Sequence, residues 1–116
     1  MMVVHHEALP ESYLLVLAPD RANPSERELA HYLGEACRSG KPAVWIDCRL
    51  LDGFSALAAR LLRVSSFRLR QHHVRLVLCR VSERLERTLR ETFAGPDLCL
   101  VDTLDDAAGY PGLGAA

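Results

Sequence analysis

Short apolar runs alternate along this chain with segments whose apolar residues recur at helical spacing, a pattern typical of α/β domains. The apolar runs predict about five strands, over residues 3–8, 13–18, 43–47, 74–81 and 98–101. The helical spacing predicts about four helices, over residues 24–39, 55–71, 82–93 and 104–108. Apolar residues at 29, 33 and 36, for example, fall on one face of the first helix.

The connections between these segments predict the topology of the sheet. Only residues 9–12 separate the first two strands, which is enough for a hairpin, so these strands should be antiparallel. Residues 43–47 are apolar almost without alternation, as expected of a central parallel strand. The pattern therefore predicts an α/β fold with a mixed, mostly parallel sheet and an N-terminal β-hairpin.

Polar residues and glycines mark the expected ends of the helices. Asn23 can cap the first helix, with Pro24 at its first position and Glu26 completing a capping box. Gly40 can end that helix in a left-handed conformation. The later helices have hydroxyl residues at their expected starts, namely Ser55, Ser82 and Thr103.

The length of 116 residues fits one domain, which we place at residues 1–108. Residues 109–116 are rich in glycine and alanine and have little to bury, so we expect a flexible tail. No apolar run approaches the roughly 20 residues that a membrane span needs, and the start lacks the features of a signal peptide. The sequence therefore predicts a cytoplasmic protein without direct membrane insertion.

Charge and cysteine content narrow the class further. The formal net charge of −1 gives no indication of nucleic-acid binding. The four cysteines are widely spaced and form no CxxC pair, which fits reduced thiols better than a disulfide framework. We expect all of them to be buried as small apolar residues: Cys37, Cys48, Cys79 and Cys99.

The order of predicted elements resembles that of STAS domains, which occur in anti-sigma-factor antagonists and in the cytoplasmic tails of sulfate transporters. Three segments carry the resemblance across nearly the whole chain. Val44-Trp45-Ile46-Asp47 looks like the family's central strand with its terminal acid. Residues 74–82 look like its strand running into a "V-S" helix start, and residues 103–107 are similar to its closing "T-x-x-E-A". The resemblance implies a protein-binding module in a bacterial regulatory system, not an enzyme.

The chain departs from the family at its functional signature, D-S-S/T-G-L, whose second hydroxyl residue is phosphorylated by a partner kinase. One alignment matches Asp52 to the family's aspartate, with a deletion in the preceding loop, and puts Gly53 and Phe54 at the hydroxyls. In this alignment Phe54 occupies the phosphoacceptor position.

A second alignment runs without a gap from Asp47 and places Ser55 on the family's aspartate and Leu57 at the phosphoacceptor position. We prefer it because Ser55 then keeps the helix-capping role of an aspartate. Neither alignment leaves a residue that can carry phosphate at the family position. Ser55 is the nearest hydroxyl, and it could be phosphorylated only by giving up its cap.

The second predicted helix has two distinct faces. One arc should face the core and consists of Leu57, Ala58, Leu61, Leu62, Val64 and Leu69. Three arginines and one aromatic residue fall on the opposite side: Arg60, Arg63, Phe67 and Arg70. This combination is typical of a protein-binding patch. The alternative is that Phe67 packs against a neighbouring helix while the arginines are solvated.

No catalytic or metal-binding set emerges from the sequence. His5 and His6 are adjacent in a strand and should point to opposite faces, so they cannot hold one metal ion together. Three aspartates follow strand ends as in receiver domains, but no lysine follows Lys41 to contact a phosphoryl group. There is no nucleotide-binding glycine loop. We therefore predict no enzymatic activity and no cofactor.

The predicted function is binding of an anti-sigma factor or a kinase-like regulator. The alternative is an accessory subunit of a membrane transport ATPase or permease, and a homodimer also remains open. Following the resemblance, we place the contact on the loop before the second helix and on its exposed side. The predicted contact residues are Leu50, Leu51, Asp52, Gly53, Phe54, Ser55, Arg60, Arg63, Phe67 and Arg70.

Overall fold

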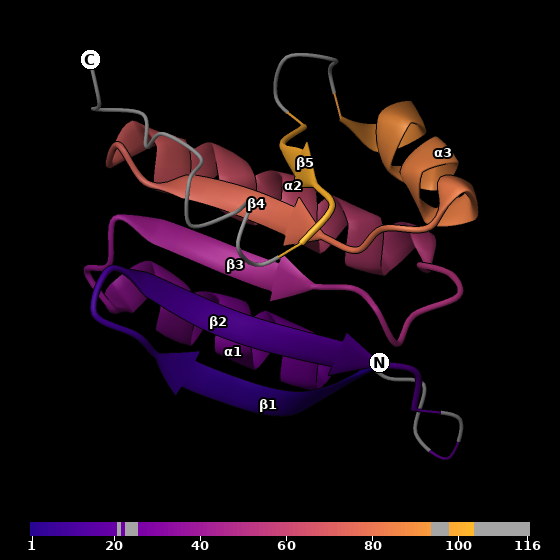
Figure 1. The fold of residues 1–116 in the computed structure, drawn as a ribbon, viewed down its shortest axis with the longest axis horizontal. Helices are drawn as coiled ribbons and strands as arrows, with labels where there is room; N and C mark the ends of the chain where they lie inside the picture. The colour runs from indigo at the N-terminus through magenta and orange to yellow at the C-terminus, as the bar shows by residue number, and fades with distance from the viewer. Residues whose placement is uncertain (21, 23–25, 94–97, 104–116) are drawn as a thin grey trace.

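The sheet has five strands in the order β1-β2-β3-β4-β5, as the computed structural model shows (Figure 1). The structure describes residues 1–20, 22, 26–93 and 98–103. The strands are β1 (Met2–Ala8), β2 (Ser12–Ala18), β3 (Ala43–Asp47), β4 (Arg75–Cys79) and β5 (Leu100–Val101). The β1–β2 pair is antiparallel and the other three pairs are parallel, which confirms the predicted mixed sheet.

Three described helices connect the parallel strands: α1 (Arg27–Arg38), α2 (Ala56–Gln71) and α3 (Glu83–Thr92). Each new strand is added on the same side of the preceding one, so right-handed crossovers place all three helices on one face of the sheet. Helix α2 lies between α1 and α3, with contacts to both. Helix α2 therefore has a neighbouring helix on each of its two sides.

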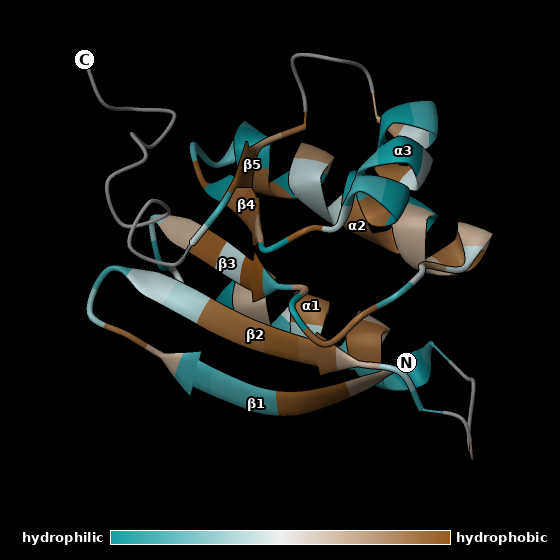
Figure 2. Ribbon diagram, turned by 45° about the vertical axis from the view of Figure 1, so that its right-hand side comes forward, coloured by the Kyte–Doolittle hydropathy of each residue, from teal (hydrophilic) through white to brown (hydrophobic). Residues whose placement is uncertain are grey.

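The main core fills the space between the sheet and the helices. Strand residues that alternate along β2, β3 and β4 contribute one side, for example Leu15, Ile46 and Leu78, all fully buried. The middle of β2 is strongly apolar, whereas part of β1 and much of α3 are hydrophilic (Figure 2). A smaller cluster, which includes Val77 and Cys79, occupies the other face of the sheet.

Several helix ends lie where the sequence predicts them. Ser55 and Ser82 cap α2 and α3, with Oγ accepting hydrogen bonds from the backbone N–H groups of Ala58 and Leu85. Gly40 has a φ of 73°, as expected for a residue that follows the last turn of a helix. The predicted helix over 104–108 and the predicted tail over 109–116 lie outside the described residues.

Other boundaries differ from the prediction. Strand β4 ends at Cys79, not at residue 81, because Arg80 adopts a φ of 55° in the left-handed region and leaves the extended conformation. Strand β5 has two residues instead of four. Helix α1 begins at Arg27, and Glu26 precedes it without a side-chain cap. The predicted capping residues Asn23 and Pro24 lie outside the described residues.

The predicted core face of α2 is partly wrong. Leu57 and Val64 are exposed, at 50% and 40%, whereas Ala59 and Ser66 are buried. Small side chains thus occupy part of the side that packs on the sheet and its neighbours. An assignment based on hydrophobicity alone favours the larger apolar residues for that side. The predicted buried face is therefore rotated about the helix axis relative to the observed one.

Three cysteines are buried, as predicted, but Cys37 is exposed on α1. Its side chain lines the groove between α1 and α2, where desolvation raises the pKa of the thiol. We therefore expect Ellman's reagent to modify one thiol in the folded protein and four after unfolding. Because the thiolate is the nucleophile, Cys37 should react more slowly than free cysteine at pH 7.5. The reaction of Cys37 should itself be faster at pH 9 than at pH 7.5.

The release of the coloured thiolate at fixed reagent concentration measures this prediction. The variant Cys37→Ser should lose the native-state reaction and keep the three slow thiols. Rapid modification of two or more thiols in the folded protein would contradict the buried positions of Cys48, Cys79 and Cys99.

Candidate partner-binding surface

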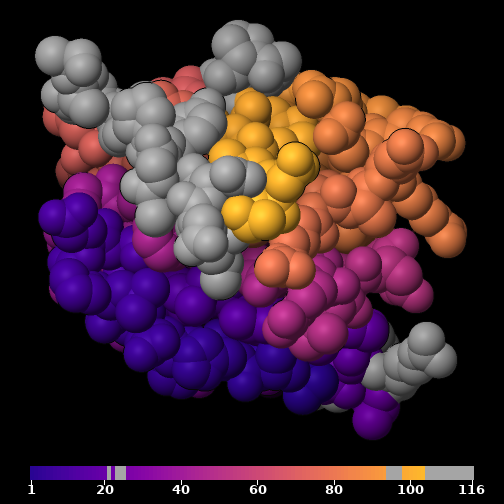
Figure 3. Space-filling model, in the orientation of Figure 1, coloured from indigo at the N-terminus to yellow at the C-terminus, as the bar shows by residue number. Residues whose placement is uncertain are grey.

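The loop after β3 brings the chain from the carboxyl end of the sheet to the start of α2. Asp47 is buried and its Oδ1 accepts a hydrogen bond from the backbone N–H of Arg49 at 2.9 Å. The backbone N–H of Leu51 then donates to the carbonyl of Cys48 at 3.0 Å. In the view of Figure 3 this loop and α3 lie on the same side of the molecule's outline.

The predicted contact residues of this loop have different surroundings. Leu50 is exposed, as are Asp52 and Gly53. Leu51 is only 6% exposed and belongs to the core, so its side chain anchors the loop and is not available to a partner. Phe54 is half-buried and packs against the core. The exposed part of the loop is therefore smaller than the sequence predicts.

Ser55 joins the start of α2 to the start of α1. Its Oγ accepts a hydrogen bond from the Ala58 N–H at 3.0 Å and donates one to Glu26 Oε1 at 2.9 Å. A phosphate on this oxygen would lose the donated hydrogen bond and bring a second negative group against the Glu26 carboxylate. The surroundings of Ser55 therefore favour a structural cap over a phosphorylation site.

Removing this cap should destabilise the protein. We expect Ser55→Ala to lower the free energy of unfolding by about 1 kcal/mol, since the helix loses its cap and the contact with Glu26. Urea unfolding followed by circular dichroism measures the change. The control is Ser65→Ala on the same helix, which removes a hydroxyl away from the cap and should be close to neutral. Equal stability of Ser55→Ala and wild type would contradict the assigned role.

Phe67 is the most exposed large apolar residue of α2, at 64%, so the alternative that it packs against a neighbouring helix is wrong. Together with Leu57 and Val64 it forms an exposed apolar row along the helix, which we call the α2 ridge. Single exposed apolar residues are common on protein surfaces, but several on one helix face mark a candidate interaction site.

Helix α2 has an unbalanced charge. It carries four arginines and no acidic residue: Arg60, Arg63, Arg68 and Arg70. On the neighbouring helices, Arg38 and Arg90 pair with Glu35 and Glu86 at 2.8 and 3.2 Å. Within the described residues no carboxylate lies within 4.0 Å of Arg60, Arg63 or Arg68. These three guanidinium groups are therefore available for charged groups of another molecule.

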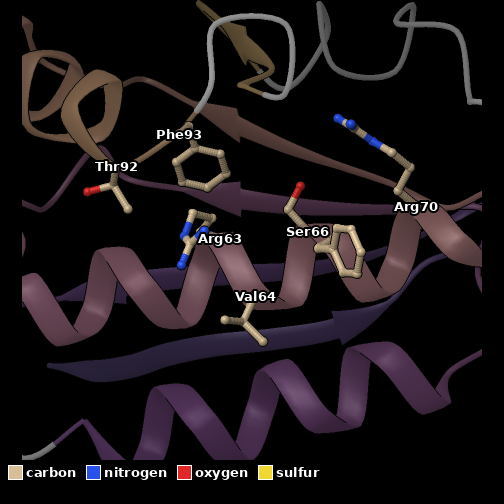
Figure 4. A pocket seen from close by; sticks show the side chains of 7 residues that line it. Arg63, Val64, Ser66, Arg70, Thr92 and Phe93 are labelled. Carbon is tan, nitrogen blue, oxygen red and sulfur yellow. The ribbon is translucent and has the colours of Figure 1, made fainter.

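A groove of about 500 Å³ separates α2 from the end of α3 (Figure 4). Arg63, Val64, Ser66, Phe67 and Arg70 line it from α2, and Thr92 and Phe93 line it from the other side. The structure thus brings three predicted contact residues together in one concave site: Arg63, Phe67 and Arg70. Arg60 is exposed but does not line the groove, and the loop residues lie outside it.

The sequence did not reveal the other lining residues of this groove. Val64 was assigned to the core, and nothing marked Ser66, Thr92 or Phe93 as surface-lining residues. Ser66 is the most informative of them: its hydroxyl makes no side-chain hydrogen bond to another described residue and is not among the fully buried polar atoms. The groove therefore combines apolar walls, an available guanidinium group and an accessible hydroxyl.

Metal-binding groups and membrane-spanning helices are both absent from the described residues. No group of three His, Cys, Asp or Glu side chains there could hold a metal ion. His5 lies 3.3 Å from Glu7, whereas the His6 ring lies 4.5 Å from that of Tyr32, so the two imidazoles point apart as predicted. No helix among these residues is both long and apolar enough to cross a bilayer.

The hairpin, the parallel strands and the helices on one face of the sheet define the fold of STAS domains. Solved structures with this fold superpose on most of the chain. A variant of RsbS from Moorella thermoacetica matches with a TM-score of 0.75 at 14% identity, over 91% of this chain and 95% of that one. An anti-sigma-factor antagonist (STAS) domain protein from Planctomyces limnophilus matches with a TM-score of 0.73 at 18% identity, over 89% and 92%.

An anti-sigma factor antagonist from Mycobacterium paratuberculosis also matches, with a TM-score of 0.72 at 15% identity over 90% of this chain and 89% of that one. No protein-family model matches the sequence, and no curated protein sequence is detectably similar to it. The likeness therefore lies in the fold, and the resemblance inferred from the order of the elements is confirmed at that level.

Proposed function

We propose that this chain is a cytoplasmic, non-enzymatic module that binds an anti-sigma factor or a kinase-like regulator in bacteria. The observation that carries the proposal is the surface of α2, where exposed Phe67 lines one groove with Arg63, and no described carboxylate lies within 4.0 Å of Arg63. Arginine and aromatic residues are enriched at the energetic centres of protein interfaces. Two of the structural neighbours are described as anti-sigma factor antagonists, which supports the same class of partner.

The proposed module is not switched by phosphate at the position that STAS relatives use. The two residues that align there are Phe54, which packs against the core, and Leu57, which is exposed and apolar. Neither side chain has an oxygen that can be phosphorylated. Release of the partner would then depend on another event, such as competition by a second protein.

The test is a pulldown from the native lysate with the tagged full chain as bait, followed by mass spectrometry. A double variant, Arg63→Ala with Phe67→Ala, serves as the matched bait, since both side chains are exposed and the variant should fold. We expect an anti-sigma factor or a histidine-kinase-like ATPase to be enriched on the wild-type bait and lost on the variant. Purified protein and calorimetry should then confirm direct binding.

Two other results would overturn the proposal. Recovery of a transport ATPase or a permease would assign the chain to a transporter and remove the sigma-factor role. Equal recovery of the same proteins on both baits would show that the surface of α2 is not the contact.

A further inference from the structure

We propose that the groove between α2 and α3 receives an acidic side chain of the protein partner, with an adjacent apolar side chain resting against Phe67. This inference builds on the proposed function and specifies the chemistry of the partner segment: an acidic, amphipathic stretch of polypeptide. The evidence comes from charge, burial and the shape of the groove.

Charge gives the first argument. Arg63 lines the groove, and within the described residues no carboxylate lies within 4.0 Å of its guanidinium group. Arg70 lines the same groove two helical turns further along, about 10 Å away along the axis, and adds positive charge at that end. A carboxylate placed beside Arg63 would form a charge-assisted hydrogen bond, which is stronger than one between neutral groups.

The second argument is the hydroxyl of Ser66. It lies between the two arginines on α2, lines the groove, and makes no side-chain hydrogen bond to another described residue, so its oxygen is open to the groove (Figure 4). This hydroxyl can therefore donate a hydrogen bond to a bound group without giving up one inside the protein. A carboxylate oxygen in the groove would accept a hydrogen bond from this hydroxyl while it also faces Arg63.

The apolar walls favour a peptide over a simple anion. Val64, Phe67 and Phe93 make up much of the lining, and Phe67 is exposed at its edge. A free phosphate or acetate would leave these surfaces in water, whereas a peptide that carries leucine beside glutamate would cover them. The net charge of −1 for the chain also gives no general attraction for polyanions, so the positive charge is local to α2.

Two synthetic helical peptides test the inference on the full chain. The first carries leucine on two successive turns with glutamate between them, and the second replaces each glutamate with glutamine. We expect amide shifts of the ¹⁵N-labelled protein at residues 63–67 and 92–93, and an affinity at least about ten-fold higher for the glutamate peptide.

Matched variants locate the effect. Arg63→Gln should reduce the affinity for the glutamate peptide about ten-fold and barely change that for the glutamine peptide. Arg68→Gln removes the same charge from α2 on the side of the other groove, towards α1, and should stay within two-fold of wild type. Ser66→Ala should weaken binding of the glutamate peptide with little change for the glutamine peptide.

Three outcomes would overturn the inference. Equal binding of both peptides would show that the groove does not recognise a carboxylate. Equal losses for Arg63→Gln and Arg68→Gln would reduce the effect to general electrostatics. The same shifts with sodium acetate or phosphate alone would indicate a free-anion site.

The inference and the proposed function can fail separately. If the lysate partner is recovered and its binding depends on Phe67 but not on Arg63, the acidic-segment inference fails while the proposed function stands. If the glutamate peptide binds as expected but no anti-sigma factor or kinase-like protein is recovered, only the proposed function fails.

Discussion

Replacing Phe67 with alanine should weaken binding of the protein partner by about 30-fold or more and leave the stability of the fold nearly unchanged. Truncation of an aromatic residue at the centre of an interface commonly costs about 2 kcal/mol or more, and 1.4 kcal/mol corresponds to ten-fold in affinity. Phe67 is mostly solvent-exposed in the free protein, so its loss removes little buried surface. Surface substitutions of this kind change the free energy of unfolding by about 0.5 kcal/mol or less.

Isothermal titration calorimetry with the recovered partner measures the affinity, and thermal unfolding measures the stability. Val4→Ala is the matched control, because Val4 is also an exposed apolar residue but lies in β1, at the irregularity in its pairing with β2. Wild-type affinity in Phe67→Ala would remove this residue from the interface. Equal weakening in Val4→Ala would show that the loss is not specific to the α2 ridge.

Most of the fold could be predicted because its signals are local. The short apolar runs of the strands, the helical spacing between them, the short hairpin loop and the capping serines all lie within short windows of sequence. The predicted strand ends were less accurate. Arg80 ends β4 in the left-handed conformation, and because it is not a glycine the sequence gives no sign of this.

The candidate site could be predicted only where it lies on one helix. Helical spacing placed Arg63, Phe67 and Arg70 on one side of α2, and the structure has them in one groove. The opposite wall comes from the end of α3, and the partner of Ser55 is Glu26, 29 positions away. Contacts of this kind depend on how the helices pack on the sheet, which a single sequence does not encode locally.

The orientation of α2 decides whether the groove and the α2 ridge face solvent, and a pair of leucine substitutions tests it directly. Leu62 is fully buried against the main core, whereas Leu57 is half exposed on the ridge. We expect Leu62→Ala to lower the free energy of unfolding by about 2–5 kcal/mol, because it leaves a cavity in the core. Leu57→Ala should cost about 0.5 kcal/mol or less.

Urea unfolding monitored by circular dichroism measures both changes under one condition. Since small domains have about 5–15 kcal/mol of stability, Leu62→Ala could leave too little for a clear native baseline. Leu62→Val then provides a smaller deletion at the same site, and its loss should still exceed that of Leu57→Val. Similar losses of unfolding free energy at both positions would mean that both leucines are buried. Helix α2 would then be rotated so that the face predicted from hydrophobicity alone packs on the core. In that case Val64 would be withdrawn from the surface, and the groove that carries the proposed interaction would lose one of its walls.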